Sequence, residues 1–235
     1  MIQSHRPPGP SRSLSLLILL GLALASLAGC ANNGITPELT AGRLDNPSDG
    51  IPVRLGEIRD LRRFQNSPSR TFVPSLQGDL EDFALRSRAV GRATNEARRP
   101  AENIVLDPPL TVESLVGEAA ARALREAGYR VLGPGSFGYD EAIELELEIN
   151  RLWMMQNLPP MPPHARVDIQ IRIVGALFGF ERGIDVEAYR KVSGGGMNRG
   201  LFRQALERGL DEWSENAQGE LERTRSAVER AAALQ

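Results

Sequence analysis

Three stretches in the second half of the chain alternate apolar and polar residues, which is the period of a strand with one buried face. The stretches cover residues 143–150, 167–173 and 184–192. We expect them to form an antiparallel meander, because short segments connect them and parallel neighbours would need crossovers of about a dozen residues or more. The charged positions of this meander should then share one solvated face, where opposite charges on neighbouring strands attract one another.

Strand signals also precede the meander. Residues 51–60 alternate Val53 and Leu55 with polar neighbours and predict a strand, and residues 129–132 predict a shorter one. Between these strands, residues 61–105 are rich in arginine and proline and have few periodic apolar positions. We interpret this segment as a long excursion, with room for a short strand at 71–73 and a short helix near 79–86.

Two helices are predicted by apolar residues spaced three and four apart. Residues 111–127 form the first, with Thr111 suited to the N-cap and Gly128 to the stop. The second begins near Asn198, and its continuation past Gly219 is charged and is expected to project or fray. The apolar stripes consist of Val112, Leu115, Val116, Ala119, Ala123, Leu124 and Ala127 in the first helix, and Leu201, Ala205, Leu206, Leu210 and Trp213 in the second.

These elements predict a single α+β domain, with an antiparallel sheet of about four to five strands and two helices packed on its one apolar face. We place this domain at residues 51–217 and a charged helical extension at 218–235. Residues 30–50 should form a flexible linker, because the segment is rich in Asn, Pro, Gly, Asp and Ser and lacks apolar periodicity.

The N-terminus has the three parts of an export signal. Arg6 and Arg12 stand in a polar lead, residues 14–27 form an apolar run, and two small residues precede Cys30. The run is shorter than the ~20 apolar residues that a membrane span needs. We therefore expect residues 1–29 to be a cleaved signal peptide.

Composition narrows the classes of function. The chain has 28 basic and 30 acidic side chains, a balance that lacks the positive field of nucleic-acid-binding domains. Cys30 is the single cysteine among 235 residues, so no internal disulfide can form. The folded part must therefore be held together by packing.

Residues suited to catalysis are few. The two histidines are His5, inside the predicted signal, and His164, so the chain offers neither the four ligands of a zinc site nor a base beside a nucleophile. Residues 133–138 (GPGSFG) match GxGxxG, but a strand rather than a helix is predicted after them, so we interpret them as a turn. We expect no enzymatic activity, no catalytic residues, no metal and no cofactor.

The segment WMMQNLPPMPPH, residues 153–164, is apolar where the end of a hairpin normally takes polar residues. Exposed apolar patches often mark contact sites, and methionine adapts to varied surfaces. One hypothesis is therefore that this segment binds a partner protein or the membrane surface. The alternative, that its residues fold back over the end of the core, stays open beside it. The candidate contact residues are Trp153, Met154, Met155, Leu158 and Met161.

Leu27-Ala28-Gly29-Cys30 resembles the lipobox of bacterial lipoproteins. The resemblance implies that the peptide bond before Cys30 is cut and that Cys30 carries fatty acyl chains such as palmitate. Several acyl chains together anchor a protein firmly in a bilayer. Ala31, rather than Asp, follows the cysteine, which by the same resemblance implies the outer membrane, with the domain facing the periplasm.

Residues 53–217 resemble the YajG-type lipoproteins in the order of several short segments, namely VRLGEIRDLR, VGRAT, ALREAGYRV, IELELEINRLW and ALERGLDEW. The resemblance implies a periplasm-facing lipoprotein, related in architecture to accessory lipoproteins of envelope transporters and to activators of peptidoglycan synthases. It supplies no catalytic residues. The long excursion and the proline-rich hairpin depart from the family pattern.

Together these features predict a membrane-anchored lipoprotein without enzymatic activity that binds other cell-envelope components as an accessory or assembly factor. An alternative is a carrier that holds a lipid or other apolar small molecule between helices and sheet for an envelope transport system. A hydrolase of the cell wall is a third hypothesis, for which the sequence offers no acid–base pair. The partner and the oligomeric state are left open.

Overall fold

The computed structural model describes residues 34–40, 45–66, 72–93, 102–156, 163–176, 183–194 and 198–232. The chain divides into two units, residues 1–32 and 33–235, and every described residue belongs to the second. The predicted signal peptide and Cys30 lie outside the described residues.

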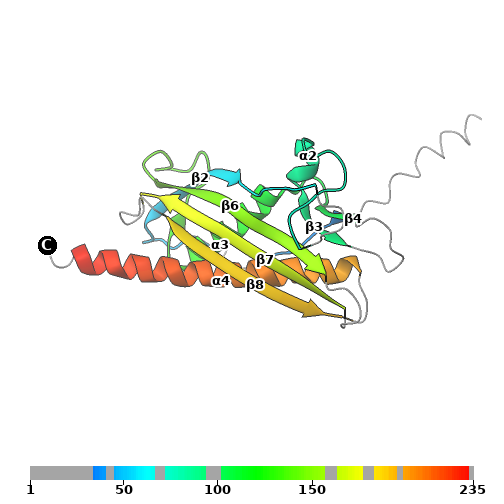
Figure 1. The fold of residues 1–235 in the computed structure, drawn as a ribbon. Helices are drawn as coiled ribbons and strands as arrows, with labels where there is room; N and C mark the ends of the chain where they lie inside the picture. The colour runs from blue at the N-terminus through cyan, green and yellow to red at the C-terminus, as the bar shows by residue number, and fades with distance from the viewer. Residues whose placement is uncertain are drawn as a thin grey trace, which may run out of the picture. The chain divides into compact units, whose positions relative to one another are not determined.

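The described part of the chain forms one mixed sheet of eight strands with three helices, so the predicted α+β class is confirmed (Figure 1). β6 lies between β7 on one side and β2 and β3 on the other. The strands are β1 (Gly34–Ile35), β2 (Pro52–Asp60), β3 (Ala89–Ala93), β4 (Glu102–Leu106), β5 (Arg130–Val131), β6 (Ile143–Gln156), β7 (His164–Gly175) and β8 (Ile184–Ser193). The helices are α2 (Phe83–Arg86), α3 (Val112–Glu126) and α4 (Arg199–Ala232).

The predicted meander is confirmed, but the predicted all-antiparallel sheet of four to five strands is wrong. β6, β7 and β8 pair antiparallel in sequence order. β2 pairs parallel with β6, and β5 and β1 also join their neighbours in parallel. The reason is that residues 61–142 separate β2 from β6, which is ample chain for a parallel crossover.

Within β6 the alternation predicted from residue 143 onward changes phase. A register irregularity lies between Ile149 and Arg151, so the extra residue moves the following side chains to the opposite faces. Ile149 and Leu152 therefore both belong to the main core. The strand continues to Gln156, six residues beyond the alternating stretch.

The arginine-rich excursion contains two strands that the pattern did not reveal. β3 and β4 pair antiparallel, and the first four residues of β3 are all buried, so β3 has no alternation to detect. A Cβ at Gly91 would lie 2.8 Å from the carbonyl oxygen of Met154, so glycine allows β3 to approach β6. The helix expected near 79–86 is the four-residue α2, whereas Phe72 and Val73 are not in a strand.

The prediction of a flexible linker is wrong for the described residues between 34 and 50. β1 pairs with β4, with Gly34 opposite Val105, and the Ile35 side chain is buried in the main core. The Thr40 hydroxyl donates to Asp211 of α4 at 2.6 Å. The domain therefore begins at β1 rather than at residue 51.

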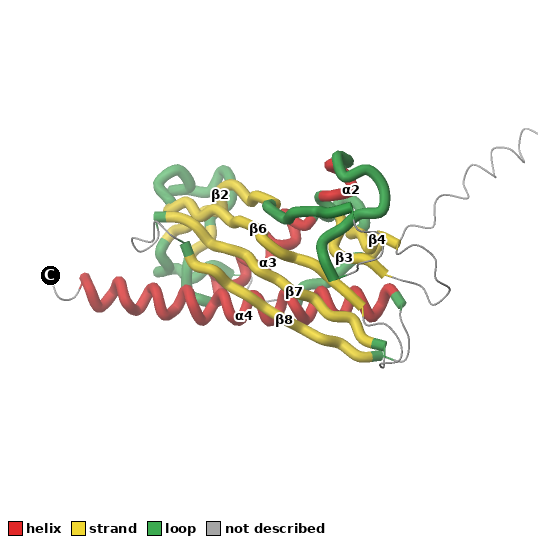
Figure 2. Tube along the Cα trace, in the orientation of Figure 1, coloured by secondary structure: helices red, strands yellow, loops and turns green. Residues whose placement is uncertain are grey.

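Helix α3 forms as predicted, with Thr111 as its N-cap. The Thr111 hydroxyl accepts from the Ser114 main-chain nitrogen at 3.1 Å, and the Ser114 hydroxyl accepts from the Thr111 main-chain nitrogen at 3.0 Å. Serine thus completes a capping box in which glutamate is more usual. Apolar residues of α3 and α4 share the main core with the inward side chains of the sheet, so both helices cover one face, as predicted (Figure 2).

The buried Arg122 side chain joins three parts of the domain. It donates from α3 to the hydroxyl of Ser214 at 3.0 Å and to the carboxylate of Asp211 at 2.7 Å, both in α4. It also donates to the main-chain oxygen of Thr40 at 2.7 Å. A hydrogen-bonded ion pair therefore ties the segment after β1 to both long helices.

The predicted fraying of the last helix past Gly219 is wrong for its first turns. Leu221 is 1% exposed and packs with Tyr129 and Leu145 in a second apolar cluster. The Tyr129 hydroxyl donates to the Leu221 main-chain oxygen at 3.4 Å. The charged extension proposed for 218–235 therefore begins as part of the domain. No helix among the described residues is long and apolar enough to cross a membrane.

Replacing Leu221→Ala should lower the free energy of unfolding by about 2–5 kcal/mol, because it leaves a cavity in a packed cluster. Urea denaturation followed by circular dichroism measures the change. Glu222→Ala, at the exposed neighbouring position, is the matched control and should change stability by less than ~0.5 kcal/mol. Equal stabilities of the two variants would mean that α4 frays at this point.

Candidate functional site

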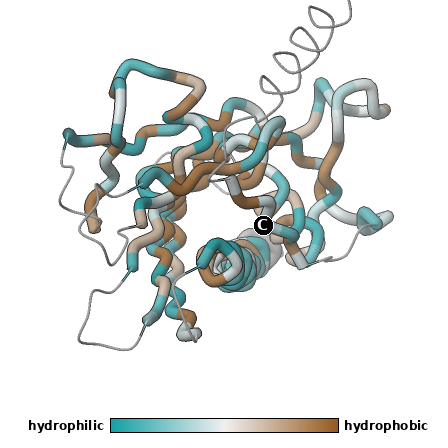
Figure 3. The backbone as a smooth tube through the Cα atoms, turned by 90° about the vertical axis from the view of Figure 1, so that its right-hand side faces the viewer, coloured by the Kyte–Doolittle hydropathy of each residue, from teal (hydrophilic) through white to brown (hydrophobic). Residues whose placement is uncertain are grey.

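The face of the sheet that α3 and α4 do not cover has two halves. We call the covered half the region where Trp153 and Met155 pack against the described residues between 61 and 88, Phe64 and Leu76 among them. We call the open half the outward side chains of β2, β7, β8 and the first part of β6. Figure 3 shows hydrophilic and hydrophobic positions mixed along the backbone of the domain. The open half consists of Arg54, Arg59, Glu144, Glu146, Glu148, Asp168, Gln170, Arg172, Asp185, Glu187 and Tyr189.

The structure places the candidate contact residues of β6 inside the protein. Trp153 and Met154 are fully buried, and Met155 is 6% exposed. Met154 faces the main core, while Trp153 and Met155 pack with Leu76 of the excursion. The proposed contact through these three residues is therefore wrong, and the alternative that they complete a core is correct. Leu158 and Met161 lie outside the described residues.

The apolar end of β6 thus packs against the excursion, and the two segments together form a small separate core. The ring of Phe64 meets the indole of Trp153 edge to face, with centroids 6.0 Å apart. Such an arrangement is favoured between aromatic rings. This cover could not be predicted, because residues 61–66 and 72–88 have no helical or strand period that would predict a packed face.

The buried side chain of Arg62 holds the excursion in place. It is 2% exposed and forms a two-pronged ion pair with Asp60, with nitrogen–oxygen distances of 2.7 and 2.8 Å. A buried charge is tolerated when its donors are satisfied. The other guanidinium hydrogen bonds go to the main-chain oxygens of Arg86, Ala89 and Leu152.

The open half carries ion pairs between neighbouring strands, as the sequence predicted for a solvated face. Arg54 pairs with Glu144 at 2.8 Å. Arg59 reaches both Glu146 at 2.8 Å and Glu148 at 2.9 Å. These glutamates therefore act as partners of arginines from β2, and their surroundings offer no apolar pocket that would suit a general acid.

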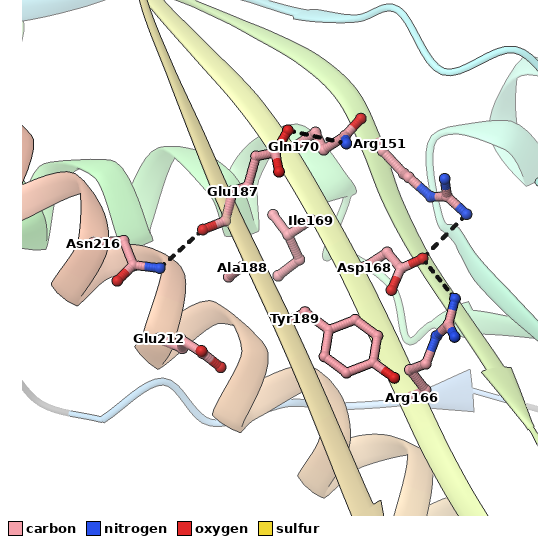
Figure 4. A pocket seen from close by; sticks show the side chains of 10 residues that line it. All are labelled: Arg151, Arg166, Asp168, Ile169, Gln170, Glu187, Ala188, Tyr189, Glu212 and Asn216. Atoms are coloured by element: carbon pink, nitrogen blue, oxygen red, sulfur yellow. Dashed lines mark hydrogen bonds and ion pairs between the residues drawn. The ribbon is translucent and has the colours of Figure 1, made fainter.

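A shallow pocket of about 340 Å³ lies across β7 and β8 at the edge of the open half (Figure 4). Asp168 stands between two arginines, with its Oδ2 atom 3.1 Å from Arg151 and 3.1 Å from Arg166. The Arg166 guanidinium also lies over the ring of Tyr189, 4.9 Å from its centroid. The ring is 52% exposed, so an aromatic side chain and two cations are accessible together.

The far wall of this pocket comes from α4. The Asn216 amide donates to the main-chain oxygen of Glu187 at 2.9 Å, and Glu212 pairs with Arg190 at 2.9 Å. These contacts cover part of the free edge of β8, which would otherwise invite another strand. The arrangement can bind a polar and aromatic surface, and it contains no nucleophile beside a base.

Other candidate sites do not assemble. Among the described residues, no group of three or more His, Cys, Asp or Glu is placed to hold a metal ion. Residues 133–138 form a turn that leads into β6, as predicted.

Burial lowers the pKa of the Arg92 guanidinium in β3.

No family model and no curated protein sequence matches the chain. Its fold is similar to that of a DUF330 protein from Xanthomonas campestris, with 11% identity, 84% of this chain and 97% of that chain covered, and a TM-score of 0.43. It is also similar to a "putative lipoprotein" from Caulobacter crescentus, with 18% identity, 49% and 84% coverage, and a TM-score of 0.35.

A hypothetical protein from Chlamydia trachomatis is similar as well, with 9% identity, 72% of this chain and 96% of that chain covered, and a TM-score of 0.35. Likenesses at these scores carry no argument about function. None of these three proteins is named as YajG-type, so that resemblance stays a prediction.

Replacing Arg62→Met should lower the free energy of unfolding by about 3–5 kcal/mol, because Asp60 and buried main-chain oxygens lose their partner. In a Trp213→Phe background, the emission of Trp153 should shift to the red as the excursion loosens. The exposed neighbour Arg63 provides the control, since Arg63→Met should leave both stability and emission nearly unchanged. Unaltered Trp153 emission in Arg62→Met would show that the excursion is held by other contacts.

Proposed function

We propose that this chain is a lipoprotein anchored through Cys30 in the outer membrane, with its domain facing the periplasm. In this proposal it has no catalytic role and acts as an accessory or assembly factor that binds other cell-envelope components. The observation that carries the proposal is the sequence Leu27-Ala28-Gly29-Cys30 behind a short apolar run, close before a domain that begins at Gly34.

The open half is the surface that best supports the binding role. Its ion pairs are largely internal, so the face carries little free charge to attract nucleic acid. Tyrosine and arginine are the residues that most often dominate protein–protein contacts. The exposed Tyr189 and the arginines beside Asp168 supply both at one place. We therefore propose an envelope protein as the partner of this pocket.

The alternative role as a carrier of apolar molecules has less support. The layer between the helices and the sheet is filled by buried side chains, Trp213 and Leu210 among them. A second pocket of about 450 Å³ is walled by charged residues such as Asp49, Glu126 and Arg225, whereas sites for apolar ligands are lined mainly by hydrophobic side chains. No feature of the described residues favours this role.

Replacing Cys30→Ser should abolish acylation, because the hydroxyl does not replace the thiol that the lipobox resemblance implies is modified. Cells labelled with radioactive palmitate and then fractionated measure both acylation and membrane attachment. Ala31→Asp is the matched variant, which should keep the label but move the protein to the inner membrane on a density gradient. A wild-type protein without label would refute the anchor.

Replacing Tyr189→Ala should weaken partner binding about thirtyfold, the loss expected for an aromatic hot spot worth ~2 kcal/mol. A photo-crosslinking residue at Gln170, which lines the same pocket, reports the partner in intact cells. Tyr139→Ala is the control, because Tyr139 also lies against an arginine, Arg54, but outside this pocket. Crosslinking that is unchanged by Tyr189→Ala, or lost equally in both variants, would exclude the pocket.

A further inference from the structure

The loop that joins β5 to β6 presents a bare aromatic ring. Phe137 lies in this loop, at residues 133–141, and its side chain is 102% exposed, the highest value among the large apolar residues of the described part of the chain. Almost none of the ring therefore touches the rest of its own domain. A single exposed apolar side chain is common on protein surfaces, so the surroundings of the ring decide whether it is a contact residue.

Main-chain hydrogen bonds give this loop a defined shape. The Ser136 nitrogen donates to the Gly133 oxygen at 3.0 Å, and the Tyr139 nitrogen donates to the Ser136 oxygen at 3.1 Å. Gly135 and Gly138 have φ angles of 83° and 80°, which glycine adopts without steric cost. The ring is thus carried on a preorganised turn, and a contact residue held in this way loses less conformational entropy when it binds.

Two carboxylates accompany the ring. Asp140 and Glu141 are exposed, and neither has an ion pair or a hydrogen bond in the described part of the chain. Three residues separate Phe137 from Asp140, so their α-carbons lie within about 11 Å of one another. A surface that fits this loop must therefore offer a recess for an aromatic ring and positive charge close beside it.

The pocket beside Tyr189 has both properties (Figure 4). Arg151 and Arg166 share the single carboxylate of Asp168, at 3.1 Å each, so two positive charges meet one negative charge. The Tyr189 ring is 52% exposed, and the pocket holds about 340 Å³. An incoming phenylalanine can pack against the tyrosine ring or lie over a guanidinium, and both arrangements are attractive.

The acidic residues on the other wall of the pocket already have partners. Glu187 accepts from the Gln170 amide at 3.2 Å, and Glu212 pairs with Arg190 at 2.9 Å. The positive charge that is left unbalanced therefore lies beside Asp168, where a carboxylate that arrives with the aromatic ring would be attracted.

The loop and the pocket belong to different parts of one face. The Arg54 guanidinium, in the open half, lies 5.1 Å from the centroid of the Tyr139 ring at the base of the loop. β6 then runs from Ile143 to Arg151, eight residues or about 25 Å. Two copies that face each other through their open halves could each place Phe137 in the pocket of the other, which makes the contact twice and closes the pair.

We propose that Phe137 of one copy binds in the pocket beside Tyr189 of a second copy, with Asp140 and Glu141 next to the arginines around Asp168. The two copies then form a symmetric pair through their open halves. The inference rests on the binding role of this pocket in the proposed function, and it names the partner as a second copy of this chain.

The test uses the full-length protein in intact cells, expressed as two copies with different affinity tags. A photo-crosslinking residue at the exposed Ser136 should give a product of two copies that carries both tags, and mass spectrometry should place the crosslinked peptide in β7 or β8. Phe137→Ala should lower the yield about tenfold. Phe83→Ala is the matched control, because Phe83 is 75% exposed but lies on α2, and it should leave the yield unchanged.

Charge reversal tests the second part of the contact. Asp140→Lys combined with Glu141→Lys should lower the yield several-fold, because the new cations would face those of the pocket. Both side chains are exposed, so the fold should be kept, which circular dichroism checks. An unchanged yield in this variant or in Phe137→Ala would overturn the proposed contact, and products larger than two copies would overturn the closed pair.

A second crosslinking position separates the inference from the proposed function. If a residue at Gln170 captures a different envelope protein and Ser136 gives no product with both tags, the second copy is overturned as the partner while the binding role of the pocket stands. If neither position captures any protein, the binding role of the pocket fails together with the inference. A product with both tags from a protein whose Cys30 is not acylated would refute the anchor and support the pairing.

Discussion

The buried guanidinium of Arg62 is the interaction on which the first half of this domain depends. It binds the carboxylate of Asp60 at the end of β2 and main-chain oxygens from α2, β3 and β6. Arg62, two residues after the end of β2, thereby holds the later part of the excursion against the sheet. The cover over Trp153 and the close approach of β3 to β6 both follow from that return.

This interaction is costly as well as useful. Removing a guanidinium from water is unfavourable, and the ion pair offsets that cost when nearly every donor finds an acceptor. Five hydrogen bonds from the Arg62 side chain meet this condition. Arg122 has the same role on the other face, where it joins α3, α4 and the segment after β1. Directional pairs of this kind favour one arrangement of irregular segments in a way that apolar contact alone does not.

The return of the excursion also places the start of the domain. β3 pairs with β4, and β4 provides the edge on which β1 pairs. β1 therefore lies beside β4, at the opposite end of the domain from the C-terminal part of α4 (Figure 1). In the proposed function, the open half of the sheet faces other components of the envelope.

The sequence by itself determined the elements whose burial follows a period. The meander, α3 with its Thr111 cap, and the stripe of α4 up to Trp213 could all be predicted, because strands and helices with one buried face repeat every two or about 3.6 residues. The solvated charges of the open half followed from the same period. The export signal and Cys30 are read from local sequence, and they remain predictions.

The tertiary structure decided every feature in which burial comes from distant residues. β3 is buried on both faces and shows no period, and β1 is too short to show one. Trp153 and Met155 looked like an exposed patch because the residues that cover them, Phe64 and Leu76 among them, belong to a segment without a period of its own. Leu221 is buried only because Tyr129 and Leu145 meet it from elsewhere in the chain. A local sequence pattern shows that a residue is apolar. Which segment buries that residue depends on long-range strand pairing and on buried ion pairs such as that of Arg62.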